Sequence, residues 1–302
     1  GMYDIGLSSG RTLFQLLAER LKRLEQVVAN SINGTSLVGA CPFYVMTSPI
    51  NHEQTVTYFK ENHYFGLSEC DVLFFQQGML PCMTNEGKII METASRVSMA
   101  PDGNGGIYAS LKKSGLFNDM LRRGIKYLHV FSIDNALTKI ADPAFVGYCI
   151  MQHSDCGNKV VWKSGPHEKV GVIAEKNDKP CVVEYSEITT DKKLLTSADG
   201  RLVFGAGNIC SHFYTMDFLR DKVMPNVENL YHVARKKIPY YDAVTETTIN
   251  PETNNGIKLE SFIFDVFPLS ERMGVLDALR DQEFAPVKNA PGTPIDRYVL
   301  CI

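Results

Sequence analysis

Apolar residues recur every three or four positions in the first part of the chain, which is the spacing of one face of a helix. The pattern covers residues 11–30 and predicts an amphipathic helix there, with Asn33-Gly34 as its stop. The apolar positions are Leu13, Leu17, Leu21, Leu24 and Val28. One stripe of this helix is therefore expected to face a core.

Three short apolar runs at residues 43–46, 72–75 and 128–133 each end in polar residues, which is typical of strands buried in a sheet. A helix is predicted over residues 53–62. Strands that alternate with helices imply an α/β fold with a doubly wound, mostly parallel sheet. Because such sheets bind ligands beyond the carboxyl ends of their strands, Gln77 and Asp134 become candidate site residues.

The pattern of apolar and turn-forming residues changes after residue 158. Short β-rich runs at 159–162, 170–174 and 181–185 are separated by Gly, Pro, Asn and Asp, and they predict antiparallel strands inserted beside the parallel core. A further strand is predicted over 202–210, followed by a helix through Phe218 and Leu219. No repeat or low-complexity linker marks a domain boundary.

The composition is that of an ordinary globular protein. The 302 residues carry a formal charge of −3, with 44% hydrophobic and 22% charged residues, which excludes a disordered tail, a collagen-like fibre and a strongly basic nucleic-acid binder. No window approaches the roughly 18 unbroken apolar residues of a membrane helix, so no membrane partner is expected. The eight cysteines form no CxxC pair and are read as reduced thiols, which favours a cytoplasmic protein.

The most informative stretch is MAPDGNGG at residues 99–106. Its three glycines permit backbone conformations that a Cβ would forbid, and they let a ligand approach the main chain closely. Asn104 among them offers both a hydrogen-bond donor and an acceptor. On pattern alone, a ligand loop and a simple tight turn remain equally open.

This stretch closely resembles the MAPDGNGG segment of eukaryotic UDP-N-acetylglucosamine pyrophosphorylases. Further segments resemble motifs of that family in the same order along the chain. Residues 1–6 look like the piece just after its phosphate loop, 75–81 resemble FEQGMLP, 129–135 resemble HVYCVDN, 182–188 match VVEYSEI, 207–209 match GNI, 255–258 match NGIK, 262–267 resemble FVFDVF and 287–290 resemble LKNA.

The resemblance implies a Rossmann-like, GT-A-like sheet of the nucleotide-diphospho-sugar transferase type. It also implies a uridylyltransferase that joins UTP and N-acetylglucosamine 1-phosphate, giving UDP-N-acetylglucosamine and pyrophosphate, with Mg²⁺ as the cofactor. Residues 1–284 would form the catalytic core, and residues 285–302 would lead toward a C-terminal domain. The family's glycine-rich LxGGxGTRxG phosphate loop would precede Gly1 and does not occur in this sequence.

The resemblance also assigns roles at the nucleotide. The residues implied at the uracil are Gln77, Met99, Pro101 and Gly103. Asp134 would hold Mg²⁺ against the phosphates, because hard oxygen ligands suit that ion. Lys258 and Lys288 would place positive charge on the phosphates during in-line attack on the α-phosphorus.

At the sugar, the implied residues are Asn104, Gly171, Glu184, Tyr185, Asn208 and Phe264. The two asparagines would hydrogen-bond the hydroxyls or the acetamido group. Gly171 would offer its backbone, and Glu184 would accept from the hexose hydroxyls. Tyr185 and Phe264 would form the wall around the N-acetyl group.

Each assignment has a structural alternative. Asp134 could be the N-cap of a helix that begins at Ala136, and Glu184 could simply point outward from a strand. Phe264 could be an ordinary core residue, and either lysine alone could be a solvated surface residue. For the function, an inactive UDP-sugar-binding homologue and a pyrophosphorylase for UDP-N-acetylgalactosamine or UDP-glucose remain open. The oligomeric state is not predicted.

Overall fold

The computed structural model describes residues 1–31, 41–227 and 231–287. The chain begins with helix α1 (Leu13–Ser31), strand β1 (Phe43–Thr47), helix α2 (His52–Glu61) and strand β2 (Val72–Gln76). Two short 3-10 turns, η1 (His63–Gly66) and η2 (Glu69–Asp71), connect α2 to β2. These elements confirm the helices and strands predicted from the first periodic segments. The predicted stop at Asn33-Gly34 lies outside the described residues.

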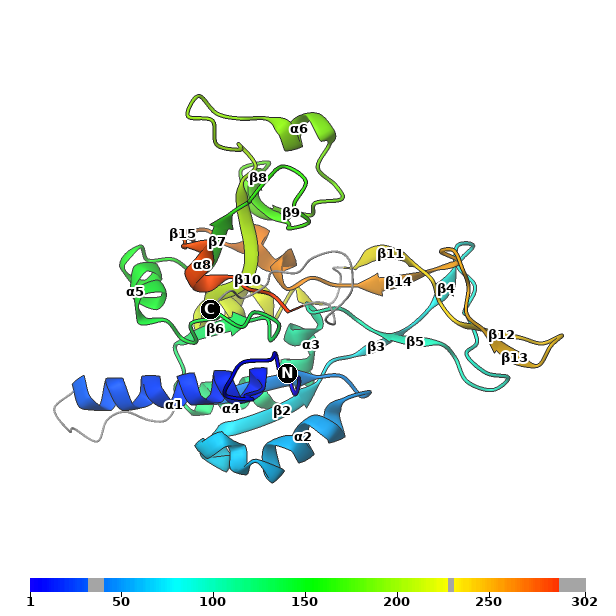
Figure 1. Ribbon diagram of the computed structural model, residues 1–302, viewed down its shortest axis with the longest axis horizontal. Helices are drawn as coiled ribbons and strands as arrows, with labels where there is room; N and C mark the ends of the chain where they lie inside the picture. The colour runs from blue at the N-terminus through cyan, green and yellow to red at the C-terminus, as the bar shows by residue number, and fades with distance from the viewer. Residues whose placement is uncertain (32–40, 228–230, 288–302) are drawn as a thin grey trace.

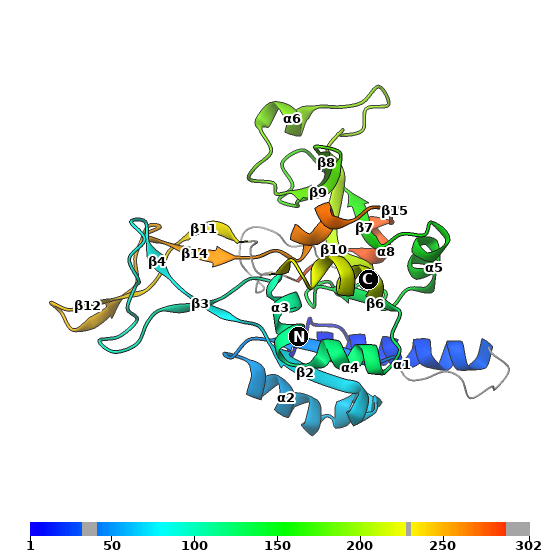
Figure 2. The same ribbon diagram turned by 180° about the vertical axis from the view of Figure 1, so that it is seen from behind.

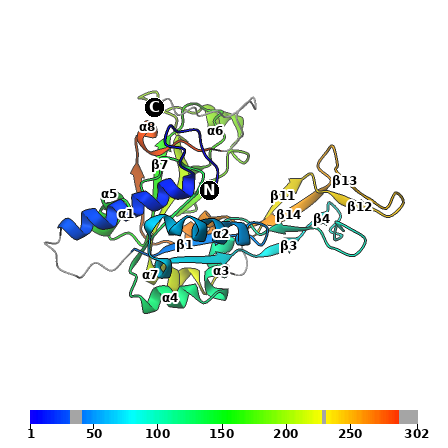
Figure 3. The ribbon, with the colours of Figure 1, turned by 60° about the horizontal axis from the view of Figure 1, so that its bottom comes forward.

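Strands β1 and β2 form a parallel pair that is covered by helices on both faces. Phe43 pairs with Val72 and the register continues to Thr47 and Gln76. Val45 and Val72 pack against α1 and α2, whereas Phe75 packs against α3 (Gly106–Lys113) and α4 (Leu116–Arg122). Figure 3 shows α2 on one side of these strands and α3 and α4 on the other. This part of the fold is therefore the α/β arrangement that the alternating pattern predicts.

The main sheet is mixed, and the expectation of a mostly parallel sheet is wrong for it. Its strand order is β15-β7-β10-β8-β9, with β6 paired to β10. Only the pair of β7 with β15 is parallel among these described strands, and the other four pairs are antiparallel. The bounds are β6 (Tyr127–Phe131), β7 (Cys156–Trp162), β8 (Val172–Lys176), β9 (Lys179–Val183), β10 (Ala206–Thr215) and β15 (Met273–Asp277).

The physical reason for this error is the way the strands are connected. An apolar run records that a strand is buried, but not which way its neighbours run. The chain returns from β7 to β10 through the β8–β9 hairpin rather than through a helical crossover, so β10 runs opposite to β7. The hairpin itself confirms the predicted antiparallel strands, with Asn177 and Asp178 at positive φ in its tight turn.

The remaining helices lie in the connections that follow strands of the main sheet. α5 (Pro143–Met151) packs beside β7 and β15, and α6 (Thr190–Leu194) lies in the long connection from β9 to β10. The predicted helix through Phe218 and Leu219 is confirmed as α7 (Met216–Phe218), which continues into a π-helical turn, η3 (Leu219–Val223). α8 (Arg280–Glu283) follows β15. None of the helices in the described ranges is both long enough and apolar enough to span a bilayer.

An arm of short strands extends from one side of this body (Figure 1) and is seen from behind in Figure 2. It consists of three small sheets, with the orders β3-β5, β11-β14-β4 and β12-β13. Its strands are β3 (Met79–Pro81), β4 (Met83–Thr84), β5 (Met99–Pro101), β11 (His232–Lys236), β12 (Tyr240–Asp242), β13 (Thr247–Ile249) and β14 (Gly256–Glu260). The 3-10 helix η5 (Ile263–Leu269) follows β14 and returns the chain to the body.

The predicted domain boundary near residue 284 falls just after α8. Residues 288–302 lie outside the described part of the chain, so this boundary stays a prediction.

Candidate functional site

The glycine turn after β5 is built around a close approach to the backbone that follows β14. Gly103 has φ +91°, and a Cβ there would overlap the carbonyl oxygen of Ser261. The Gly105 N–H donates to that carbonyl at 2.9 Å, and the Ser261 N–H donates to the Asp102 carbonyl at 2.7 Å. The glycines are therefore needed for contact between two segments that are about 160 residues apart, as well as for turn geometry.

Asn104 connects this turn to η5. Its side-chain Oδ1 accepts a hydrogen bond from the Ile263 N–H at 2.9 Å. Ile263 is the first residue of η5, and Phe264 is the second. The predicted ligand residue Asn104 thus lies beside the predicted wall residue Phe264.

Asp102 is a buried residue of this turn that the sequence analysis did not single out. Its carboxylate lies between Gly78 and Gly106, where an added Cβ would meet a carboxylate oxygen at either position. Burial is the main cause that raises the pKa of Asp102, opposed by backbone hydrogen bonds from its own N–H and from Gly78. Its Oδ1 has no hydrogen-bond partner among the described residues. The sequence signal was present, since this acid stands directly before the glycine-rich residues 103–106.

The predicted uracil residues lie along the β3–β5 ladder that leads into the turn. Met79 pairs with Pro101, and Pro81 pairs with Met99. The Asp102 N–H donates to the Gly78 carbonyl at 3.1 Å, which extends the ladder toward Gln77 and Gly103. Gln77 follows β2 directly, and its N–H donates to Thr47. Gln77, Pro101 and Gly103 therefore gather at the body end of this ladder, whereas Met99 lies farther out and is 44% exposed.

A second group forms where β8, β9 and β10 meet. The Asn208 N–H donates to the Gly171 carbonyl at 2.8 Å, and Oδ1 of Asn208 accepts from the Cys210 N–H at 3.0 Å. A Cβ on Gly171 would lie 2.9 Å from Oε1 of Glu184. Glu184 directly follows β9, and extending the β8–β9 register by one pair puts it opposite Gly171. Tyr185 comes next and is 38% exposed.

Both groups border the same hydrophobic cluster. Val182, two residues before Glu184, and Cys210, two residues after Asn208, pack against the core that contains Phe264. The Phe262 and Phe264 rings stack with centroids 5.0 Å apart. Phe264 is only 9% exposed, so it is also a residue of the hydrophobic core, as the structural alternative expected. Asn104 therefore contacts the start of η5 directly, and β9, which leads into Glu184, packs against η5.

The predicted phosphate and metal residues lie elsewhere on the described surface. Lys258 is on β14 opposite Ala234, three residues before the contact with the glycine turn. Asp134 follows β6, where its Oδ1 accepts from the Ser132 hydroxyl at 2.6 Å and its carbonyl accepts from the Val287 N–H at 2.8 Å. A turn follows Asp134 and α5 begins only at Pro143, so the N-cap alternative is wrong. Lys288 lies outside the described residues.

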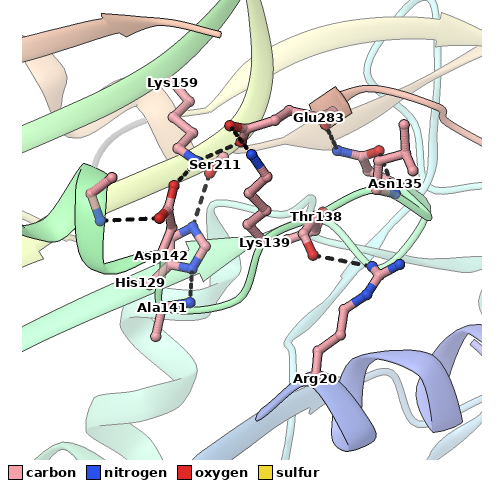
Figure 4. Close-up of polar contacts among 12 residues, drawn as sticks. Arg20, His129, Asn135, Thr138, Lys139, Ala141, Asp142, Lys159, Ser211 and Glu283 are labelled. Atoms are coloured by element: carbon pink, nitrogen blue, oxygen red, sulfur yellow. Dashed lines mark hydrogen bonds and ion pairs between the residues drawn. The ribbon is translucent and has the colours of Figure 1, made fainter. Parts of the chain in front are cut away.

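The sequence analysis missed a buried charged cluster around Lys159 (Figure 4). Lys159 on β7 is 1% exposed, and its ammonium lies 2.5 Å from carboxylate oxygens of both Asp142 and Glu283. A lysine in the otherwise apolar run of residues 159–162 was the available signal, because lysine is almost never fully buried without a partner.

The comparisons with known proteins bear on the whole chain. The family model described as UTP–glucose-1-phosphate uridylyltransferase matches residues 2–293. This chain belongs to that family. The match confirms the resemblance drawn from the MAPDGNGG segment and the other ordered motifs.

Individual relatives and a solved structure are also similar to this chain. The chain is 46% identical over 299 residues to a human UDP-N-acetylhexosamine pyrophosphorylase-like protein 1, covering 98% of this chain and 58% of that protein. It is 45% identical to the Saccharomyces cerevisiae UDP-N-acetylglucosamine pyrophosphorylase, covering 98% of this chain and 62% of the relative. The solved structure of the Trypanosoma brucei UDP-N-acetylglucosamine pyrophosphorylase superposes with a TM-score of 0.86 at 34% identity, covering 97% of this chain and 58% of that one. This chain therefore spans about 60% of the length of these relatives.

Proposed function

We propose that the whole protein containing this chain is a uridylyltransferase. It joins UTP and N-acetylglucosamine 1-phosphate to give UDP-N-acetylglucosamine and pyrophosphate. The observation that carries the proposal is the match over residues 2–293 to a uridylyltransferase family, with relatives named for N-acetylated sugars at about 45% identity. Two observations support the same proposal: Asn104 contacts the residue before Phe264, and β9, which leads into Glu184, and β10, which carries Asn208, pack against the same hydrophobic cluster as Phe264.

The chemistry requires positioning more than proton transfer. A sugar phosphate is already an anion near neutral pH, so its oxygen can attack the α-phosphorus of UTP without a strong base. The protein then has to align the two substrates and stabilise the charge that develops on the phosphates. Lys258 and Lys288 are the groups that we assign to this charge stabilisation.

The uracil and the sugar would be bound by the two groups of residues described above, at the glycine turn and where β8, β9 and β10 meet. Gln77 and the Gly103 backbone would contact the uracil, with Met99 and Pro101 packing nearby. Asn104, Asn208 and the Gly171 backbone would hydrogen-bond the sugar, and Glu184 would accept from its hydroxyls. Tyr185 and Phe264 would bound the acetamido group.

Asp134 is the residue that we assign to Mg²⁺. Its carboxylate offers hard oxygen donors, and Mg²⁺ is commonly held by one or two carboxylates together with substrate phosphates. Among the described residues, no group of three or more Asp, Glu, His or Cys could form a metal site by itself, so a single carboxylate acting with phosphates suits the donor set. The bound ion would neutralise phosphate charge.

The test is pyrophosphate release from UTP when N-acetylglucosamine 1-phosphate is added to the whole protein with Mg²⁺. Turnover supports the proposal. Absence of turnover, together with calorimetric binding of UDP-N-acetylglucosamine, would assign a binding homologue instead.

A second candidate is a pyrophosphorylase that accepts related sugars. The family description names glucose 1-phosphate, and the human relative is named for N-acetylhexosamines in general. Parallel kinetics with glucose 1-phosphate and N-acetylgalactosamine 1-phosphate decide between them. Equal efficiency for glucose would argue against an acetamido pocket at Tyr185 and Phe264.

A further inference from the structure

The cluster around Lys159 joins three elements that are far apart in the sequence. Lys159 lies on β7, Asp142 caps the N-terminus of α5 by accepting from the Ala144 N–H at 3.0 Å, and Glu283 ends α8. Glu283 accepts from Lys159 through Oε2 and from Lys139 through Oε1 at 3.1 Å. Burial alone would raise the pKa of Asp142, but its hydrogen bond to Lys159 and the lysine charge lower it. The cluster therefore contains two carboxylates and two ammonium groups.

Glu283 also begins a continuous set of contacts with the turn after β6. Its carbonyl accepts from Nδ2 of Asn135 at 2.7 Å, and Oδ1 of Asn135 accepts from the Ala285 N–H at 2.9 Å. The Val287 N–H then donates to the carbonyl of Asp134 at 2.8 Å. Residues 283–287 are thus fixed, one hydrogen bond after another, against the turn that carries Asp134.

The same turn is held from its other side by α1. The Arg20 guanidinium donates to the carbonyl of Ala136 at 2.6 Å and to that of Thr138 at 3.1 Å. Figure 4 shows Arg20 beside Thr138. The turn of Asp134 is therefore held directly by one cation, Arg20, and indirectly by a second, Lys159, through Glu283 and the 283–287 segment. Of these two, only Lys159 also holds the segment whose next residue in the sequence is Lys288.

We propose that Lys159 and Glu283 form a positioning pair, which fixes the 283–287 segment against the Asp134 turn and so sets the spacing of the metal carboxylate and the segment leading to Lys288. The proposal rests on the function proposed above. Neither Lys159 nor Glu283 is assigned a contact with substrate. A buried ion pair is a poor source of net stability but defines a single register between the elements it joins.

The experiment compares two variants of the whole protein that each remove one carboxylate from the same ammonium group. Glu283→Gln removes the carboxylate that ties the 283–287 segment to Lys159. Asp142→Asn is the matched control, because it removes the other carboxylate while Asn still caps α5, and the described structure gives Asp142 no hydrogen bond to residues 283–287. Turnover, both KM values, thermal stability and amide hydrogen exchange are measured for each variant.

We expect Glu283→Gln to lower kcat by about ten- to a hundredfold, because small misplacements of reacting groups have effects of that size, with KM for both substrates little changed. Exchange at the Ala285 and Val287 amides should become faster. Asp142→Asn should lower the melting temperature similarly but leave kcat within about twofold and those two amides protected. If Glu283→Gln does not fold, Glu283→Asp, which keeps the charge and retracts it by one methylene, replaces it.

Equal losses of kcat in the two variants, in proportion to their loss of stability, would overturn the proposal. So would a Glu283→Gln variant with wild-type kcat and unchanged exchange at Ala285 and Val287. If the wild-type protein itself shows no turnover, the proposed function fails. The exchange comparison then still decides whether Glu283 holds this segment against the Asp134 turn.

Discussion

At the scale of single residues, two buried ionisable side chains have polar atoms without hydrogen-bond partners in the described ranges. They are Asp102, through Oδ1, and His212, through both ring nitrogens. Burial raises the pKa of Asp102 and lowers that of His212 to about 3, with the charge of His129 lowering the latter further. Both shifts favour the neutral form, because the charged form would lose its hydration without a compensating partner.

The burial of His212 leads to a prediction about how the free energy of unfolding depends on pH. The unfolded histidine takes up a proton near pH 6.5 and the folded one only near 3. Between these values the unfolded state binds more protons, so the free energy of unfolding falls as the pH falls from 6.5 toward 3, by at most about 1.4 kcal/mol per pH unit for this group. His212→Phe should flatten that dependence in denaturant titrations across this range. The exposed His167→Gln is the control, and equal slopes in the two variants would contradict the prediction.

The glycine turn makes a second prediction. Gly103→Ala should be strongly destabilising, because it adds left-handed backbone strain of about 1–2 kcal/mol and also an overlap with Ser261. Gly115→Ala is the matched control, since Gly115 has φ +78° but open space around its Cβ position. Denaturant unfolding should show a larger loss for Gly103→Ala than for Gly115→Ala. Equal losses would mean that the contact with Ser261 is unimportant.

At the scale of elements, η5 is the part that links the two halves of the candidate site. Three side chains hydrogen-bond the backbone of its first residue, Ile263. Asn104 accepts from the Ile263 N–H, and the Tyr108 hydroxyl donates to the Ile263 carbonyl at 2.5 Å. The Tyr214 hydroxyl lies 3.0 Å from that of Tyr108 and 3.4 Å from the same carbonyl. The position of Phe264 thus depends on α3 and β10 as well as on the glycine turn.

We therefore expect Tyr108→Phe to lower the free energy of unfolding by about 1–3 kcal/mol, since it leaves a buried carbonyl without its shorter hydrogen bond. Tyr214→Phe should cost less, because its hydroxyl is the more distant partner. Because Phe264 follows Ile263, Tyr108→Phe should also weaken UDP-N-acetylglucosamine binding in calorimetry. A larger loss for Tyr214→Phe would reverse the assignment of the two hydroxyls.

At the scale of the whole molecule, the body and the arm each carry residues of the candidate site. The arm delivers the glycine turn and Lys258, whereas the main sheet delivers Glu184, Asn208 and the turn of Asp134. Substrate selectivity should therefore respond to residues where the two meet, and turnover should respond to the charged groups around the phosphates.

Selectivity is tested at Phe264. Phe264→Gly should raise the relative kcat/KM for sugar phosphates with bulkier N-acyl groups, because it opens the wall assigned to the acetamido group. Phe267→Leu, in the same hydrophobic cluster, is the control for general loosening of the core. An unchanged preference in Phe264→Gly would leave Phe264 with a packing role alone.

Turnover is tested at Lys288. Lys288→Ala should lower kcat by about 10²–10³-fold if its charge stabilises the transition state, with the circular dichroism spectrum unchanged. The exposed Lys237→Ala controls for loss of a positive charge in general. A wild-type rate in Lys288→Ala would remove this lysine from the mechanism.

The sequence by itself determined the local features of this protein. Helical spacing located α1 and α2, apolar runs located β1 and β2, and the glycine motif located the turn of Gly103 and Asn104, because periodicity and backbone freedom are properties of neighbouring residues. Only the tertiary structure decided the direction of β10, the burial of Asp102 against Gly78, and the pairing of Lys159 with Glu283 across 124 positions. Strand direction and charge compensation depend on residues that meet only when the chain folds, so no local pattern records them.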